Sequence, residues 1–219
     1  MYQLKRGFRK SILLRVTKDA AVEVLAPFSM KKKEIDAFVL KKREWLLAQL
    51  EIAEAKKEAR EQYALAEVIF LGEAYPVRLY DGAKIKFENN AFLLPRGSVE
   101  ERRKKMITWY KKQAKEILSE RVAFWAEKMQ TTYAAVKVTS AKTRWGSCTS
   151  QQNLNFSWRV MFAPPDAIDY VVIHELAHTK EMSHSKVFWG IVETYCKEYK
   201  AMQAKLKETG AALDRQGWE

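Results

Sequence analysis

Alternating apolar residues near the start of the chain predict a β-hairpin over residues 11–27. Apolar side chains recur at every second position of both arms, which is the period of a strand with one buried face. They are Ile12, Leu14 and Val16 in the first arm and Val22, Val24 and Ala26 in the second. The polar pair at 18–19 marks the turn, and Pro27 ends the second arm.

The apolar period then lengthens to that of an amphipathic helix. Ser29 is a suitable N-cap, because its hydroxyl can accept a hydrogen bond from a backbone N–H of the first turn. The apolar stripe of this helix comprises Ile35, Phe38, Val39, Trp45, Leu46 and Leu50. Residues 51–60 are rich in Ala, Glu and Lys, so we expect one long helix whose second half is mostly solvated.

Short apolar runs with β character return over residues 67–95, where Asp81-Gly82 and Asn89-Asn90 are turn signals. Ser98 and Glu101 then match a capping box, which predicts a second long helix over about residues 99–130. The predicted core stripe of that helix contains Met106, Trp109, Tyr110, Ile117, Val122 and Trp125.

The last third of the chain predicts two strands followed by helices. The strands lie within residues 136–160, and the second has one apolar face, formed by Leu154, Phe156, Trp158 and Val160. Pro164 and Pro165 mark the start of a helix over about residues 166–180. A further helix carries the apolar residues Val187, Phe188, Ile191 and Val192. We expect Gly210 to cap the last helical segment.

Composition narrows the class of protein. The chain has 219 residues, and its hydrophobic fraction of 47% allows a sizeable core. It has no apolar run long enough to span a membrane and no signal-peptide pattern, so we expect a cytoplasmic protein without membrane contact. Cys148 and Cys196 lack the C-x-x-C spacing of redox and metal motifs, and we interpret them as free buried thiols.

Most of the net charge of +12 lies in the first 132 residues. Residues 1–132 contain 28 Lys and Arg against 18 Asp and Glu, which is a net charge of +10. Such an excess attracts nucleic acid through the basic N-terminal part, or it is a solvated face that keeps the protein soluble. The second interpretation is preferred at this point.

The positions of the histidines give the strongest indication of function. The chain has only three histidines, and all lie within residues 174–184. His174 and His178 are four residues apart on a predicted helix, so their rings share one face and can bind one zinc ion. Glu175 points about 100° round the helix, which directs it to a water at the open coordination position. There it can act as the general base of a metal-assisted hydrolysis.

A third protein ligand completes a catalytic zinc site, because three ligands leave one position open for water. His184 is the first candidate, since a turn just beyond the helix can bring it to the metal. Glu193 and Glu198 on the next helix are the competing candidates.

Two motifs resemble the YgjP-like metallopeptidase family. The first runs from Tyr170 through H-E-L-A-H to His184 and Trp189, and the second is R-W-G-S-C at residues 144–148 with Asn153 to Arg159 after it. Together they cover about residues 136–210. The family is similar to the SprT-like and WLM zincins.

The resemblance implies an α+β fold. Residues 98–219 would form a zincin-like metallohydrolase domain, with the H-E-x-x-H helix against a small sheet. Residues 1–97 would form a β-hairpin/helix/β module. It also implies zinc held by the three histidines and a glutamate base. Thr179 and Ser183 depart from the usual leucine and asparagine. Metzincins share the histidine spacing but have glycine where this chain has Glu181, so their loop conformation is not expected here.

The role of the R-W-G-S-C segment stays open at this stage. It either lies beside the cleft, touching substrate or holding the metal helix, or it is a tight turn with a packed Trp145 and a buried Cys148. The second interpretation is preferred. Arg144, Arg159 and Tyr195 are candidates for stabilising the oxyanion of the transition state, and the sequence does not choose among them.

Three functions compete. The first is a zinc metallopeptidase whose extended peptide or protein substrate pairs with an edge strand, for which residues 153–160 are the candidate. The second is a zinc-dependent nucleotide hydrolase, in which the basic excess attracts phosphates. The third is a nucleic-acid-associated protease of the SprT-like type, which rests on analogy. The metallopeptidase is the leading hypothesis.

Overall fold

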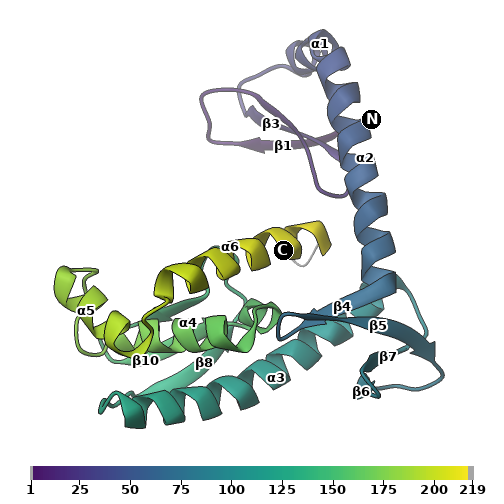
Figure 1. Cartoon of the computed structure of the whole chain (residues 1–219). Helices are drawn as coiled ribbons and strands as arrows, with labels where there is room; N and C mark the ends of the chain where they lie inside the picture. The colour runs from purple at the N-terminus through teal and green to yellow at the C-terminus, as the bar shows by residue number, and fades with distance from the viewer. Residues whose placement is uncertain (1, 217–219) are drawn as a thin grey trace. The chain divides into compact units, whose positions relative to one another are not determined.

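A computed structural model describes the backbone of residues 2–216, and it describes the side chains of this range except at 58–66 and 215–216. The chain divides into two compact units, Met1–Tyr63 and Ala64–Glu219 (Figure 1). Each unit is treated by itself below.

The N-terminal unit contains a three-stranded sheet with the order β1-β3-β2. The predicted hairpin is confirmed: β2 (Leu13–Val16) pairs antiparallel with β3 (Val22–Pro27). The sequence analysis missed β1 (Gln3–Gly7), which pairs parallel with β3. Charge helps to hold this strand, because the Lys5 ammonium of β1 and the Arg15 guanidinium of β2 both contact the Glu23 carboxylate of the middle strand.

The predicted first helix is divided in two. The first segment, α1 (Lys32–Lys41), is followed after Lys42 by α2 (Arg43–Ala66). The predicted N-cap at Ser29 is wrong, because the helix begins later, where the Glu34 carboxylate accepts a 2.8 Å hydrogen bond from the Lys31 backbone N–H. The buried core of this unit is small and comprises Leu14, Val22, Val24, Ala26 and Ile35.

The C-terminal unit begins with a four-stranded sheet of order β4-β5-β7-β6. Its strands are β4 (Glu67–Phe70), β5 (Glu73–Tyr80), β6 (Lys86–Glu88) and β7 (Ala91–Pro95). The turn predicted at Asn89-Asn90 joins β6 to β7, and both residues have positive φ, as a tight hairpin turn requires.

Helix α3 (Val99–Lys128) confirms the predicted second long helix and its capping box. The Ser98 hydroxyl accepts from the Glu101 N–H at 3.2 Å, and the Glu101 carboxylate accepts from the Ser98 N–H at 3.0 Å. Of the predicted stripe, three residues are fully buried and three are partly buried. The first group is Met106, Tyr110 and Val122, and the second is Trp109, Ile117 and Trp125.

A second sheet, of order β8-β10-β9, follows α3. Its strands are β8 (Ala135–Thr139), β9 (Gly146–Cys148) and β10 (Asn153–Ser157). The strand predicted to reach residue 160 ends at Ser157, and a 3₁₀ helix, η1 (Trp158–Phe162), takes its place. The Ser157 hydroxyl explains the ending, because it accepts from the Arg159 N–H and donates to the Ala141 carbonyl at 2.7 Å.

The position of β10 corrects a second expectation. Residues 153–157 form the middle strand, with β8 on one side and β9 on the other, so they cannot offer a free edge to a substrate. The edge strands of this sheet are β8 and β9.

Three helices complete the unit: α4 (Pro165–Ala177), α5 (Lys186–Tyr195) and α6 (Tyr199–Gln216). Helix α4 lies between α3 and α6 and also contacts α5 and β9 (Figure 1). The predicted cap at Gly210 is wrong, because α6 continues past it. The buried Leu213 extends the apolar stripe of Met202 and Leu206 and favours a longer helix.

One hydrophobic core joins the first sheet of this unit to the later helices. Val68, Phe92 and Leu94 belong to the same cluster as Leu176 of α4. The division into compact units falls after Tyr63 and leaves these side chains in one unit, while the domain boundary predicted at residue 97 stays a prediction. None of the helices in the described part of the chain has the length and apolar character that crossing a bilayer requires.

Candidate metal centre

Helix α4 carries candidate functional side chains and is packed within the hydrophobic core. Pro165 stands at its N-terminus, where a missing N–H costs no helical hydrogen bond. The predicted stripe of Ile168, Val172 and Leu176 is buried. Helix α4 therefore has little freedom to rotate, and His174 and Glu175 of its last turn, with His178 at its C-cap, take fixed directions.

Polar contacts also fix α4 on α3. The Arg121 guanidinium pairs with both oxygens of Asp169. Thr131 and Thr179 share a hydrogen bond of 2.6 Å between their hydroxyls. Thr179, which stands where a leucine is common in the family, thus has a structural role at the end of the metal helix.

The three histidines meet at one point. One ring nitrogen from each of His174, His178 and His184 lies within 4.8 Å of the others. The Nε2 atoms of His174 and His184 are 3.1 Å apart. Within the described part of the chain, this is the one group of three or more metal-binding side chains, so Glu193 and Glu198 do not join it.

Aromatic side chains of α5 position the imidazoles. The His178 ring stacks on Phe188 with 4.4 Å between centroids, and the His184 ring stacks on Trp189 at 5.8 Å. Phe188 is fully buried and also meets the edge of the His174 ring. The start of α5 is set by Ser185, whose hydroxyl accepts from the Phe188 N–H at 3.3 Å.

A backbone carbonyl orients His178. Nδ1 of His178 donates to the Glu181 carbonyl at 3.1 Å, which leaves the lone pair of Nε2 for a metal. Glu181 is not among the residues with positive φ, so the loop differs from the left-handed turn that a glycine would favour. The Glu181 carboxylate accepts from the Ser183 N–H at 3.0 Å, which gives Ser183 a place in the loop.

Burial favours the neutral imidazoles of His174 and His178. Burial, together with the neighbouring His178 and His184, lowers the pKa of His174 to about 4. Burial likewise lowers the pKa of His178, which the Glu181 carbonyl opposes. Neutral imidazole is the form that binds a metal, so these two side chains need no deprotonation at pH 7.

Glu175 is a buried carboxyl beside strand β9. Its side chain is 5% exposed, and Oε2 has no hydrogen-bond partner among the described residues. Burial raises the pKa of Glu175 to about 8, and the positive charge of Arg144 opposes this rise. A Cβ on Gly146 would lie 2.5 Å from Oε1 of Glu175, so only glycine leaves room for the carboxylate here.

A cleft opens beside these residues. It has a volume of about 390 Å³ and is lined by His174 and Glu175 of α4, by residues 144–146 and by α6. The sequence analysis did not find the contribution of α6, which includes Gln203 and Lys207. The polar and charged residues of an amphipathic helix carry no signal that separates a cleft wall from an ordinary solvated face.

The R-W-G-S-C segment lies beside the cleft and forms a strand instead of the expected tight turn, whereas the expected packing of Trp145 and Cys148 against the core is confirmed. Gly146–Cys148 forms β9 and contacts α4. Cys148 is only partly buried, and its pKa is raised by burial and by Glu175. Arg144 lines the cleft, whereas Arg159 lines a neighbouring cavity and Tyr195 packs against the core.

The donor set fits a metal ion. Three nitrogen donors converge, the remaining nitrogen of His178 is already satisfied, and the orphaned oxygen of Glu175 is buried close by. Convergent imidazoles next to a buried carboxyl are typical of metal-dependent hydrolases.

Comparison with known proteins gives the family. A model described as YgjP-like, metallopeptidase domain matches residues 10–209, and the chain belongs to this family. The protein is therefore a metallopeptidase, as the resemblance of its motifs implied.

Other similarities are remote. The metallopeptidase zymogen of Pyrococcus abyssi abylysin has 19% sequence identity to this chain, and the match covers 41% of this chain and 90% of that one. The TM-score of 0.38 is too low to support a structural argument. No curated protein matches the sequence at a significant level.

Proposed function

We propose that the protein is a zinc metallopeptidase whose ligands are His174, His178 and His184 and whose general base is Glu175. The convergence of the three ring nitrogens within 4.8 Å carries this proposal. Three nitrogen ligands with one open position are typical of catalytic zinc. Zinc supplies Lewis acidity, which makes a water acidic and polarises a peptide carbonyl.

Glu175 would act as the proton-transfer group of the reaction. Its carboxylate would accept a proton from the attacking water and later donate it to the nitrogen of the leaving amine. The pKa near 8 of the buried group is high for a carboxylate that must be ionised at neutral pH. The Arg144 charge and a bound cation both favour the ionised form, which makes the carboxylate available as a base.

Strand β9 is the proposed site for the substrate backbone. It is an edge strand, and it adjoins Glu175 through Gly146. An extended peptide that adds to its free edge would form main-chain hydrogen bonds and pass the proposed base. This assignment replaces residues 153–160, because 153–157 form the middle strand of the sheet and 158–160 belong to η1.

The test is an activity screen of the zinc-loaded protein against peptides and nucleotides, with Glu175→Gln as the matched variant. Glutamine keeps the size of the side chain but cannot accept the proton. We expect peptide cleavage that falls by about 10²–10⁴-fold in the variant while zinc content stays the same. Full activity in the variant, or cleavage of nucleotides alone, would exclude the proposal.

We also propose that the N-terminal unit binds single-stranded nucleic acid. Phe8 is fully exposed, and its ring meets the exposed ring of Phe28 with 5.3 Å between centroids. The Arg6 guanidinium fixes the Phe28 segment through its backbone carbonyls, and Lys10 and Lys31 lie close by in the sequence. Exposed aromatic rings among cations are typical of surfaces that stack unpaired bases.

A further inference from the structure

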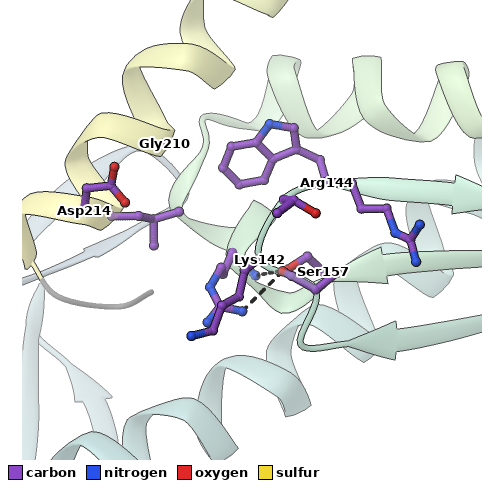
Figure 2. Close-up of a pocket in the computed structure, with 10 residues that line it drawn as sticks. Lys142, Arg144, Ser157, Gly210 and Asp214 are labelled. Atoms are coloured by element: carbon purple, nitrogen blue, oxygen red, sulfur yellow. Dashed lines mark hydrogen bonds between the residues drawn. The ribbon is translucent and has the colours of Figure 1, made fainter. Parts of the chain in front are cut away.

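Two further cavities adjoin the metal cleft. The larger has a volume of about 490 Å³ and is drawn in Figure 2, and the other has about 420 Å³. Arg144 lines the cleft and both cavities. A substrate that occupies the cleft therefore lies next to a second space large enough for a ligand group.

The walls of the larger cavity are predominantly basic. Lys142, Arg144 and Arg159 line it, and the opposing acidic residue is Asp214 of α6. In Figure 2 the Arg144 side chain extends away from Asp214. Lys142 and Arg144 are exposed, and neither forms a hydrogen bond or ion pair with another described residue. Their charges are thus available to a ligand.

The floor of this cavity is rigid. Arg159 is 7% exposed, and its Nη1 donates to the carbonyls of Ser140 and Ala141 at 3.1 and 3.3 Å. The Ser157 hydroxyl donates to the same Ala141 carbonyl. Trp145 and Leu213 provide an apolar wall. The cavity combines a fixed polar floor, exposed cations at its rim and one apolar side.

We propose that this basic cavity, lined by Lys142, Arg144 and Arg159, binds a carboxylate of the peptide substrate. The carboxylate belongs to an acidic side chain or to a free C-terminus near the cleaved bond. A guanidinium matches a carboxylate with two parallel hydrogen bonds, and the apolar wall accepts the carbon atoms that carry it. This inference rests on the proposed peptidase function, because it concerns the substrate of the same cleft.

The test measures binding, so that it does not depend on turnover. Fluorescent peptides would be titrated against the zinc-loaded Glu175→Gln protein. One set compares Glu with Gln at each position of a neutral, amidated peptide, and the other compares a free C-terminus with its amide. We expect about tenfold tighter binding of the charged peptide in one of the sets, since a hydrogen bond between charged groups is stronger than one between neutral groups.

Three variants locate the effect. Arg144→Gln should abolish the ratio between charged and neutral peptide, and Lys142→Gln should reduce it. Lys111→Gln, an exposed lysine of α3 outside these cavities, should leave the ratio unchanged. The ratio is the readout because it cancels any general change in affinity.

Three results would overturn the inference. The first is equal binding of charged and neutral peptides. The second is a charge preference that survives in both cavity variants. The third is binding of a nucleoside triphosphate through Arg144 and Lys142 that is tighter than binding of every acidic peptide, which would identify phosphate as the ligand. Failure of Glu175 as the base is a separate result, because it would appear as undiminished cleavage by the Glu175→Gln protein and would leave the charge ratio intact.

Discussion

The two compact units place their chemically important side chains in opposite environments. In the C-terminal unit, Glu175 and His178 are 5% and 9% exposed and lie on a helix enclosed by the core. In the N-terminal unit, Phe8 is fully exposed and the core beneath it is small. Burial changes the reactivity of a group, whereas exposure makes it available to a large partner. The two proposed functions should therefore be separable by mutation.

Loss of a metal ligand should have the largest effect. His184→Ala removes one of three nitrogen donors, so we expect bound zinc and peptidase activity to disappear together. Elemental analysis after gel filtration measures this. Glu193→Gln and Glu198→Gln are the matched controls, because both residues lie outside the histidine group. Normal zinc in His184→Ala with loss in either control would assign the third ligand to that glutamate.

A methyl group on Gly146 should cost about 10²-fold in activity without loss of zinc, because it displaces the proposed base. The backbone at Gly146 is outside the left-handed region, so contact with Glu175 is the reason for the cost. Overpacking of this kind costs about 1–3 kcal/mol of stability.

A double-mutant cycle isolates that contact. Glu175→Ala removes the three atoms that the new Cβ would meet, so Gly146→Ala should cost little stability in this background. Denaturant unfolding of the four proteins gives the coupling energy. Equal costs in both backgrounds would show that Gly146 acts through something other than Glu175.

The metal-free protein should lose stability between pH 4.5 and 8 because of Glu175. Its carboxyl has a pKa of about 8 when folded and the ordinary value of 4.5 when unfolded, so the folded state holds the extra proton in this window. Stability then falls as pH rises, by an amount on the order of 4 kcal/mol for a shift from 4.5 to about 8 at roughly 1.4 kcal/mol per pKa unit. His174, with its pKa lowered to about 4, acts in the opposite direction below pH 6.5.

The comparison with Glu175→Gln separates these contributions, since this variant keeps the histidines. The difference in unfolding free energy between the two metal-free proteins should increase in favour of the variant from pH 4.5 to 8. A constant difference would mean that Glu175 is ionised in the folded protein throughout.

The smallest effect is expected in the N-terminal unit. Phe8→Ala should weaken binding of a single-stranded oligonucleotide by about tenfold, since stacking on one aromatic ring contributes about 1–3 kcal/mol. Binding should fall steeply with salt and persist after zinc is removed. Phe124→Ala is the control, because this exposed ring of α3 also has cations over it. Absence of binding at low salt would leave the basic charge as a solubility feature.

Local signals accounted for much of the fold. The capping box at Ser98, the turn at Asn89-Asn90 and the alternation in β2 and β3 each depend on residues close together in the sequence. The clustering of three histidines in the sequence predicted that their side chains converge, and their ring nitrogens lie within 4.8 Å of one another. The sequence could not locate β1, whose pairing depends on Glu23 far along the chain.

The rest of the cleft depends on contacts between distant segments. Gly146 and Arg144 line the same cleft as Glu175 although about thirty residues separate them from it in the sequence, and Lys207 belongs to another helix. No periodicity predicts such meetings. The end of β10 at Ser157 and the continuation of α6 past Gly210 had a similar cause, since a side-chain hydrogen bond and a buried leucine overrode the local pattern.

Because the connection between α4 and α5 is short, a bound metal ion would also affect the local unfolding of this region. His184 lies on this connection, and within α5 the fully buried side chains are Phe188 and Val192. A bound ion would tie the connection to α4 and close a loop of a few residues. Without it, α5 is held by its packing alone, and amide hydrogens of residues 186–195 should exchange with solvent sooner than those of α4. The rate of amide hydrogen exchange in α5 would then report whether the metal is bound, although α5 itself supplies no proposed ligand.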